Sequence, residues 1–230
     1  TPEYIGYTDV GINGGIFSSR RPKIEMLENR CFKYHVDFEN LNIDDHTAAI
    51  CVSRPTNPTG NVLTHEEVQH LQAIARDRDI PFIVDSAYGM PFPNIMFGYY
   101  HLDWDKNTVV CMSLSKVGLP SMRTGIVVAD EPIIKMVSEA SAIMGLAPGN
   151  LGPAMVMDMI KSGELTRLSA ETIRPWYQDK MERTLALLHE KLHGLPYYVH
   201  KPEGALFLWL WFPDLPIKSS ELYTRLKDKG

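Results

Sequence analysis

The residues with the most distinctive chemistry lie in one short turn, Ser113-Leu114-Ser115-Lys116, and Arg123 follows soon after it in the chain. Together they supply two hydroxyls, one amine and one guanidinium. The hydroxyls and the guanidinium suit a bound phosphate, and the amine can condense with a carbonyl. These residue types at this spacing predict a site for a phosphorylated aldehyde.

Two further turns carry polar groups of complementary chemistry. Asn57 lies in the turn at residues 53–60, and Asp85 and Tyr88 lie in the turn at residues 85–89. Each of these turns follows an apolar run that predicts a buried strand. Because ligands of open parallel sheets bind beyond the carboxyl ends of the strands, the three turns are expected to converge on one site.

Pyridoxal phosphate needs the groups that these turns supply. It needs an amine for its aldehyde, an acid opposite its ring nitrogen, hydrogen-bond donors to its phenolate oxygen and polar groups around its phosphate. We therefore expect the amine from Lys116, the acid from Asp85, the donors from Asn57 and Tyr88, and the phosphate contacts from Ser113, Ser115 and Arg123. The predicted cofactor is pyridoxal 5'-phosphate.

The elements that position these turns alternate between strand and helix. Apolar runs of strand length occupy residues 48–52, 82–84 and 107–112. Thr64 and Glu67 form a capping box that predicts the start of a helix ending near Arg78. Strand, helix and strand in this order predict an α/β fold with a mainly parallel sheet flanked by helices. Residues 125–129 predict a fourth strand, whose direction the sequence leaves open.

Helices dominate the chain after this predicted sheet. Helical spacing and capping residues predict helices at residues 130–144, from Pro153 onwards and at residues 164–192. Pro175 lies inside the last of these and predicts an interruption or a kink. Nearer the N-terminus, the sequence predicts a strand at residues 15–18 and irregular structure at residues 20–45.

A change of composition near the C-terminus predicts the start of a second domain. Residues 197–199 and 206–212 are aromatic and branched and predict strands, and Ser219 or Ser220 can begin a last helix. We therefore expect a large cofactor-binding domain over residues 1–175. Residues 176–230 are expected to form a connecting helix and the start of a small α+β C-terminal domain.

Composition limits the possible functions. The 230 residues are 44% hydrophobic and carry a net charge of −5, so the chain can bury a core and has no basic face for nucleic acid. Its longest apolar run, residues 205–212, is far shorter than the roughly 20 residues of a membrane span. Cys51 and Cys111 lie in predicted strands and are expected to be reduced core residues. We expect a cytoplasmic protein with no nucleic-acid or membrane partner.

One histidine pair invites a metal interpretation that its spacing argues against. His65 and His70 lie on the predicted helix after Thr64, in a pattern similar to that of zinc proteases. Five residues on a helix place two side chains about 140 degrees apart. These two histidines are therefore not expected to bind the same ion.

The three turns resemble the signatures of the fold type I pyridoxal phosphate enzymes, the class I and II aminotransferases. The matching motifs are Asn57-Pro58-Thr59-Gly60, Asp85-Ser86-Ala87-Tyr88 and Ser113-Leu114-Ser115-Lys116 with Arg123. The resemblance implies that Tyr4 stacks on the cofactor and that Gly204 lines the substrate pocket. It also implies a homodimer that acts on amino acids and 2-oxo acids. The chemistry of the cofactor predicts that Lys116 is also the general base, because an incoming amino acid would displace its amine and leave it free beside the α-carbon.

Two positions depart from this family pattern, and two family features are missing. Arg54 stands where many relatives carry asparagine, and Ser121 stands where glycine is usual, which predicts strain if that position needs a positive φ. The family's glycine-rich phosphate loop and its carboxylate-binding arginine are expected to lie outside this chain. Since the chain begins at Thr1 without a methionine and stops at the end of a predicted helix, we expect a fragment that is inactive alone.

Other functions share parts of this pattern. A Ser-x-x-Lys motif also occurs in penicillin-binding proteins, but their Ser-Asp-Asn and Lys-Thr-Gly partners are absent from this sequence. A lyase or synthase of the same fold would use the same cofactor residues. An aminotransferase-like effector domain of a transcription regulator would keep the lysine without turnover. The sequence leaves these last two alternatives open.

Overall fold

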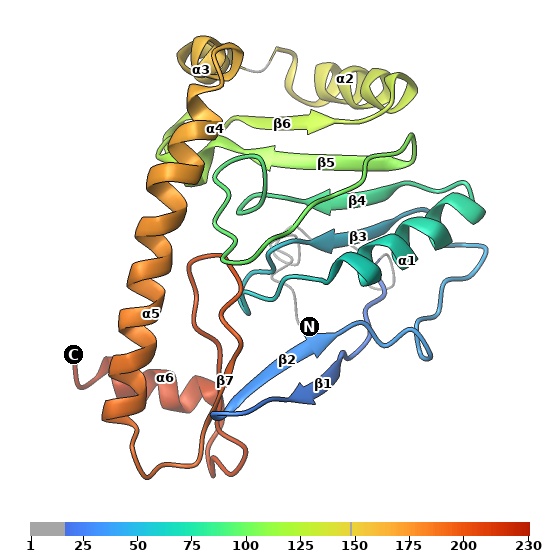
Figure 1. Cartoon of the computed structure of the whole chain (residues 1–230). Coiled ribbons are helices and arrows are strands. Elements are labelled where there is room, and N and C mark those ends of the chain that lie inside the picture. Colours follow the sequence, from blue (N-terminus) through green and yellow to red (C-terminus); the bar gives the residue numbers. More distant parts are fainter. Residues whose placement is uncertain (1–16, 148) are drawn as a thin grey trace.

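The computed structural model describes residues 17–147 and 149–230, and the first of its sheets carries the predicted turns. Four strands form this sheet in chain order: β3 (Ile50–Ser53), β4 (Phe82–Asp85), β5 (Thr108–Ser113) and β6 (Gly125–Val128) (Figure 1). β3, β4 and β5 are parallel, and β6 is antiparallel to β5. The prediction of a mainly parallel sheet is confirmed, and the structure answers the question of the fourth strand's direction.

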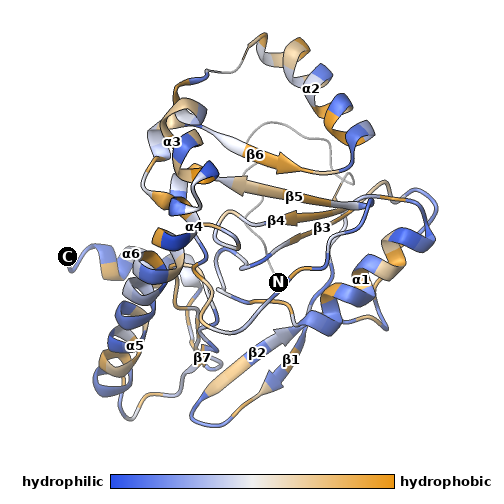
Figure 2. Cartoon of the chain, turned by 45° about the horizontal axis from the view of Figure 1, so that its top comes forward, coloured by the Kyte–Doolittle hydropathy of each residue, from blue (hydrophilic) through white to orange (hydrophobic). Residues whose placement is uncertain are grey.

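Helix α1 (His65–Asp77) covers one face of this sheet and begins at the predicted capping box. The Glu67 backbone N–H donates to Thr64 Oγ1 at 3.2 Å, and the Thr64 backbone N–H donates to Glu67 Oε2 at 2.8 Å. Helical spacing brings Val68, Leu71 and Ala75 against buried residues of β4. Figure 2 shows the matching hydropathy, with apolar colour on β5 and β6 and mixed colour on α1.

The strand pleat explains why one cysteine prediction was wrong. Ile50 and Cys51 are neighbours on β3, and Ile50 is buried whereas Cys51 is exposed. Successive side chains of a strand point to opposite faces, and α1 covers the face that holds Ile50. Cys111 is only half-buried, so neither residue is a full member of the core.

A second sheet forms from both ends of the described chain. Its strands are β1 (Lys23–Met26), β2 (Cys31–His35), β7 (Tyr198–His200) and β8 (Leu210–Trp211) in that order. β2 pairs in parallel with β7, and the other two pairings are antiparallel. Of the strand predicted at residues 206–212, only Leu210 and Trp211 form a strand in the structure. Residues 17 and 18 form no strand, and the rest of the strand predicted at residues 15–18 lies outside the described residues.

The prediction of irregular structure at residues 20–45 was wrong for residues 23–35, where β1 and β2 form a hairpin, whereas residues 36–45 contain no helix or strand. Asn29 and Arg30 both have positive φ, at 56° and 60°, and the Cys31 backbone N–H donates to the Glu28 carbonyl at 3.1 Å. This is the tight turn that matches the twist of paired strands. The fully buried Phe32 then anchors β2 against the aromatic rings of His200 and Trp211.

The remaining helices follow the predicted order. They are α2 (Glu131–Gly145), α3 (Leu151–Lys161), α4 (Glu164–Leu168), α5 (Arg174–Lys191) and α6 (Ser219–Lys227). A π-helical turn at Ser169–Ile173 separates α4 from α5, and Pro175 is the second residue of α5. Proline has no backbone N–H, so the regular helical hydrogen bonding is interrupted there. The predicted interruption is therefore confirmed, a few residues before the proline.

The predicted division of the chain at residue 175 stays a prediction. The second sheet takes strands from both sides of that position, and α5 runs from beside the first sheet towards the second (Figure 1). Within the described ranges, no helix combines the length and the apolar character needed to cross a bilayer.

Candidate active site

The acid and the amine predicted for the site lie at the ends of neighbouring parallel strands. Asp85 ends β4 and is in register with Cys111 of β5, so Ser113 at the end of β5 lies at the same edge of the sheet. One oxygen of the half-buried Asp85 carboxylate accepts the Ala87 backbone N–H at 2.9 Å. Burial, together with this carboxylate, raises the pKa of the Cys111 thiol. The parallel register therefore brings two of the predicted turns together.

Lys116 is presented by a 3₁₀ turn at Leu114–Val117 that begins directly after β5. Ser113 caps this turn by accepting the Ser115 backbone N–H on its Oγ at 3.1 Å. Gly118 ends the turn with a φ of 103°, a conformation that favours glycine. The half-buried Lys116 places its Nζ 5.2 Å from the centroid of the Tyr88 ring. Two of the predicted site residues thus meet directly.

Tyr88 is held by packing on its other side. Its side chain is buried and makes an edge-on contact with the ring of Phe207, with a centroid distance of 5.7 Å. It belongs to a buried cluster with Ile95 and Ala205. The loop after β7 therefore fixes the tyrosine that faces Lys116.

Close backbone approaches join the Asn57 turn to the other loops. A Cβ atom on Gly60 would lie 2.8 Å from the Gly204 carbonyl oxygen, and Gly60 has a φ of 71°. A Cβ atom on Gly89 would lie 2.5 Å from the Arg54 carbonyl oxygen. Only glycine permits approaches this close, so the turn that carries the half-buried Asn57 contacts the loops around Tyr88 and Gly204.

Arg123 is the predicted phosphate residue that the structure holds least firmly. It is exposed, has a φ of 46°, and donates from Nη1 to the Pro120 carbonyl at 3.3 Å. The antiparallel pairing of β5 with β6 keeps it near the Ser113 turn, because the Leu114 backbone N–H donates to the Thr124 carbonyl at 3.1 Å. Among the described residues, Arg123 makes no hydrogen bond to Ser113 or Ser115.

The predictions for Ser121 and Tyr4 have different outcomes. Ser121 is not among the described residues with positive φ, so the strain predicted for it does not arise and Arg123 adopts the left-handed conformation instead. Tyr4 lies outside the described residues, and its stacking role stays a prediction.

A buried ion pair that the sequence analysis missed ties the Asn57 turn to the second sheet. Lys33 of β2 pairs with Glu203, and their side chains are only 7% and 5% exposed. Lys33 also donates to the Val62 carbonyl at 2.9 Å, and Glu203 accepts the Val62 backbone N–H at 3.2 Å. No local pattern links these residues, since 170 positions separate Lys33 from Glu203.

Arg54, which departs from the family pattern, is a second buried anchor of the same turn. It is 3% exposed and donates to the carbonyls of Leu63 at 3.0 Å and His101 at 2.8 Å. Burial lowers the pKa of Arg54, while burial and the Glu203 carboxylate raise the pKa of Tyr100, whose ring lies 5.6 Å from the guanidinium. The arginine therefore links Leu63, which follows the Asn57 turn, to the loop that carries His101.

His200 completes this buried polar group. It is 1% exposed, and its Nε2 lies 3.0 Å from Asn61 Oδ1. Burial lowers the pKa of His200 to about 4, and the nearby Lys33 and Lys201 act in the same direction against Glu203. The histidine is therefore neutral in the folded protein at neutral pH.

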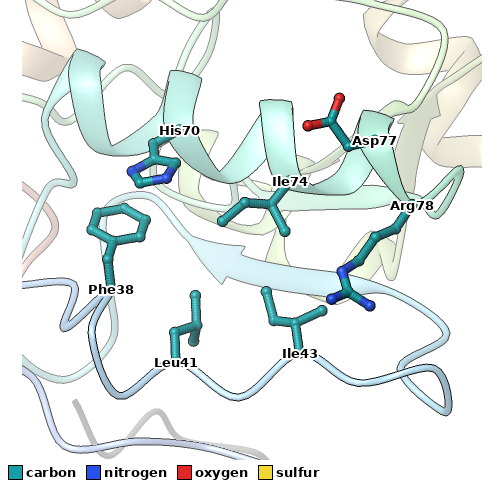
Figure 3. Close-up of a pocket in the computed structure, with 7 residues that line it drawn as sticks. All are labelled: Phe38, Leu41, Ile43, His70, Ile74, Asp77 and Arg78. Carbon is teal, nitrogen blue, oxygen red and sulfur yellow. The ribbon is translucent and has the colours of Figure 1, made fainter.

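A separate hollow of about 310 Å³ lies between α1 and the segment before β3 (Figure 3). Its lining residues are Phe38, Leu41, Ile43, His70, Ile74, Asp77 and Arg78. None of them belongs to the predicted site, and none is a lysine. This hollow therefore lacks the amine that an aldehyde cofactor needs.

The residues at the strand ends could hold pyridoxal phosphate. Lys116 offers a half-buried amine beside an aromatic ring, and Asp85 offers a half-buried carboxylate on the neighbouring strand. Ser113 offers a hydroxyl whose oxygen accepts the Ser115 backbone N–H. This donor set matches the aldehyde, the ring nitrogen and part of the phosphate.

Comparison with known proteins agrees with this chemistry. The family model for aminotransferase class I and II matches residues 19–230. The valine–pyruvate aminotransferase of Escherichia coli K12 is 52% identical over 229 residues, which cover 100% of this chain and 55% of that protein. The chain thus spans about half the length of this relative.

Solved structures give the same result. A valine-pyruvate aminotransferase from Salmonella typhimurium LT2 matches with a TM-score of 0.92 and 49% identity over 100% of this chain and 58% of that one. A putative amino-acid aminotransferase from Psychrobacter arcticum 273-4 matches with a TM-score of 0.95 and 51% identity, over 100% of this chain and 55% of that one. The chain therefore belongs to the class I and II aminotransferases, a pyridoxal phosphate-dependent family of enzymes with the fold type I α/β architecture.

Proposed function

We propose that this chain is part of an aminotransferase that moves the amino group of L-valine to pyruvate and yields α-ketoisovalerate and L-alanine. The observation that carries the proposal is the 52% identity to the E. coli valine–pyruvate aminotransferase along the whole chain. Because the chain spans 55% of this relative, the activity is proposed for the whole protein.

The proposed cofactor is pyridoxal phosphate, which supplies an aldehyde and a protonated ring that withdraws electrons from the substrate's α-carbon. Lys116 would bind the aldehyde, and Asp85 would keep the ring nitrogen protonated. Asn57 and Tyr88 would donate to the phenolate oxygen. The residues proposed to contact the phosphate or stack on the ring are Ser113, Ser115, Arg123 and Tyr4.

Lys116 is also the proposed general base. Once an amino acid has displaced Lys116 from the cofactor, the Lys116 amine would be free beside the substrate's α-carbon. Its Nζ would take the proton from that carbon, and the resulting ammonium would be the acid that returns the proton. The Tyr88 ring, 5.2 Å from Nζ, supports this role because an aromatic face attracts the ammonium form and limits where it can move.

The proposed partners of the protein are its small-molecule substrates and a second copy of itself. Helix α2 has no buried residue, and Met136, Ile143 and Met144 on it are more than 60% exposed. Exposed apolar side chains of this kind support the binding of another protein surface to this helix. A homodimer is proposed on the basis of the family resemblance, and a cytoplasmic location on the basis of the composition of the chain.

The direct test uses the full-length gene product, purified with pyridoxal phosphate and supplied with L-valine and pyruvate. We expect equal amounts of α-ketoisovalerate and L-alanine, measured by chromatography of the two products. Release of ammonia or loss of a β-substituent would identify a lyase instead. Cofactor binding without product from any amino acid would favour the effector-domain alternative.

A further inference from the structure

Three side chains with metal-binding atoms meet where the loop between β4 and β5 crosses the start of α1. His65 Nε2 lies 3.1 Å from His101 Nε2 and 3.6 Å from Asp103 Oδ2. The three ligand atoms all lie within 4.8 Å of one another. Two imidazole nitrogens and one carboxylate oxygen are common ligands of zinc and similar transition metals.

These separations suit one ion between the three atoms. Bonds of about 2.0–2.1 Å from zinc to nitrogen place two tetrahedral ligand atoms about 3.3 Å apart. The separations of 3.1 and 3.6 Å from His65 Nε2 lie on either side of that value. A small shift of the exposed Asp103 side chain, which is 60% accessible, would complete the arrangement.

Helix α1 holds Asp103 in place through two glutamines. Gln69 Nε2 donates to Asp103 Oδ2 at 3.3 Å, and Gln72 Nε2 donates to the Asp103 carbonyl at 2.6 Å. Such bonds from outside the ligand set orient metal ligands in other proteins. Three ligands with no close packing over Asp103 also leave room for a water molecule as the fourth.

Only one ring nitrogen of His65 is placed to bind a metal ion. Its Nδ1 is buried and has no hydrogen-bond partner among residues 17–147 and 149–230, while its Nε2 faces His101. The imidazole rings lie 3.8 Å apart with planes tilted by 38°. Without an ion, one Nε2 atom donates its hydrogen to the other. A bound ion would instead accept the lone pairs of both Nε2 atoms and would be balanced in part by the negative charge of Asp103.

We propose that His65, His101 and Asp103 bind one transition-metal ion of the zinc class, with water as a further ligand. The ion would hold the loop of residues 101–103 against α1. The His101 carbonyl accepts a hydrogen bond from Arg54 Nη1 at 2.8 Å. Since Arg54 lies in the turn that carries Asn57, this loop also supports that turn. The metal ligands are separate from the residues proposed for the aminotransferase reaction, and the inference does not rest on that proposed function.

The sequence contains a built-in control for this site. His70 lies on the same helix as His65, but its ring stacks on Phe38 with a centroid distance of 4.1 Å (Figure 3). His65 and His70 therefore make separate contacts in this structure. The partner of His65 is His101, which lies 36 residues away in the chain.

The test titrates Co²⁺, and then competing Zn²⁺, into the purified metal-free protein and follows the visible absorption of the bound cobalt. We expect saturation at one ion per chain and displacement by Zn²⁺. His65→Gln and His101→Gln should each weaken binding by at least about tenfold, and Gln69→Ala by about tenfold. His70→Gln should bind as the unaltered protein does, and circular dichroism checks that each variant is folded.

Other outcomes would overturn the proposal. These are the absence of saturable binding in the unaltered protein, or equal affinity in His65→Gln, His101→Gln and the unaltered protein. If either histidine variant fails to fold, Asp103→Asn replaces it, since this exposed side chain has no packing role. Cobalt binding that His70→Gln weakens as much as His65→Gln does would also contradict the site.

Discussion

The Lys116 amine lies 5.2 Å from the centre of the Tyr88 ring, although the two residues come from different strand ends. Tyr88 is in turn packed against Phe207, from the loop after β7. The Lys116 amine, the proposed catalytic group, is therefore positioned by two packed aromatic rings, Tyr88 and Phe207, which connect the first sheet to the loop after β7.

Replacement of Lys116 tests its two proposed roles together. Lys116→Ala removes both the amine that binds the aldehyde and the general base, so turnover of valine and pyruvate should fall by at least about 10³-fold. The measurement is the initial rate of alanine formation by the full-length protein. Lys191→Ala at the exposed end of α5 is the control and should retain full activity. Measurable turnover near the unaltered rate in Lys116→Ala would contradict both roles.

Asp85 and Tyr88 are predicted to contribute unequally. Asp85→Asn removes the charge that keeps the ring nitrogen protonated, whereas Tyr88→Phe removes one hydrogen-bond donor and keeps the ring beside Lys116. We expect Asp85→Asn to lower kcat by far more than Tyr88→Phe. Equal and small losses for the two variants would show that the assignment of roles is wrong.

The buried pair of Lys33 and Glu203 predicts a large loss of stability when one partner is removed. Glu203→Gln leaves the Lys33 ammonium buried without a counter-charge, which should lower the free energy of unfolding by about 3–5 kcal/mol. Urea denaturation measures this loss.

A matched control comes from an exposed ion pair on α5. The Arg183 and Asp179 side chains are 78% and 62% exposed, so Asp179→Asn should change the free energy of unfolding by less than about 1 kcal/mol. A similar effect in both variants would mean that the Lys33 pair contributes no more than a surface pair.

His200 predicts a specific loss of stability in mild acid. Its pKa is lowered from 6.5 to about 4 in the folded protein, so between these values the unfolded chain binds the extra proton. The contribution is fully present above pH 6.5 and is lost as the pH falls towards 4, at about 1.4 kcal/mol per pH unit and about 3 kcal/mol in all. The measurement is urea denaturation between pH 7 and pH 4.

The comparison variant for this pH effect is His200→Gln, which cannot titrate. The difference in unfolding free energy between the unaltered protein and this variant isolates the histidine from the carboxylates, which titrate in both. A difference that stays constant across the range would show that His200 does not carry the predicted dependence.

Local patterns in the sequence predicted the first sheet well. The apolar runs before Asn57, Asp85 and Ser113 predicted three strands, and the capping box predicted the start of α1, because each signal lies within a few neighbouring residues. The same signals placed the three turns at one edge. This part of the fold and of the site depends on short-range chemistry.

Long-range pairings could not be predicted in this way. β2 pairs with β7 across most of the described chain, and the Lys33–Glu203 and His65–His101 contacts also join distant residues. The hairpin turn at Asn29 and Arg30 lacks the glycine that usually marks such turns, so its strands were missed. Arg54 stood out in the sequence only as a departure from a family pattern, and its contacts with the distant His101 carbonyl could not be predicted from it.

The most direct test of the proposed function is chemical labelling of the cofactor lysine. The full-length protein is mixed with pyridoxal phosphate, reduced with borohydride, digested and mapped by mass spectrometry. We expect a single modified residue, Lys116, because its amine lies at the strand ends beside Tyr88. Labelling spread over surface lysines, with Lys116 unmodified, would contradict the account.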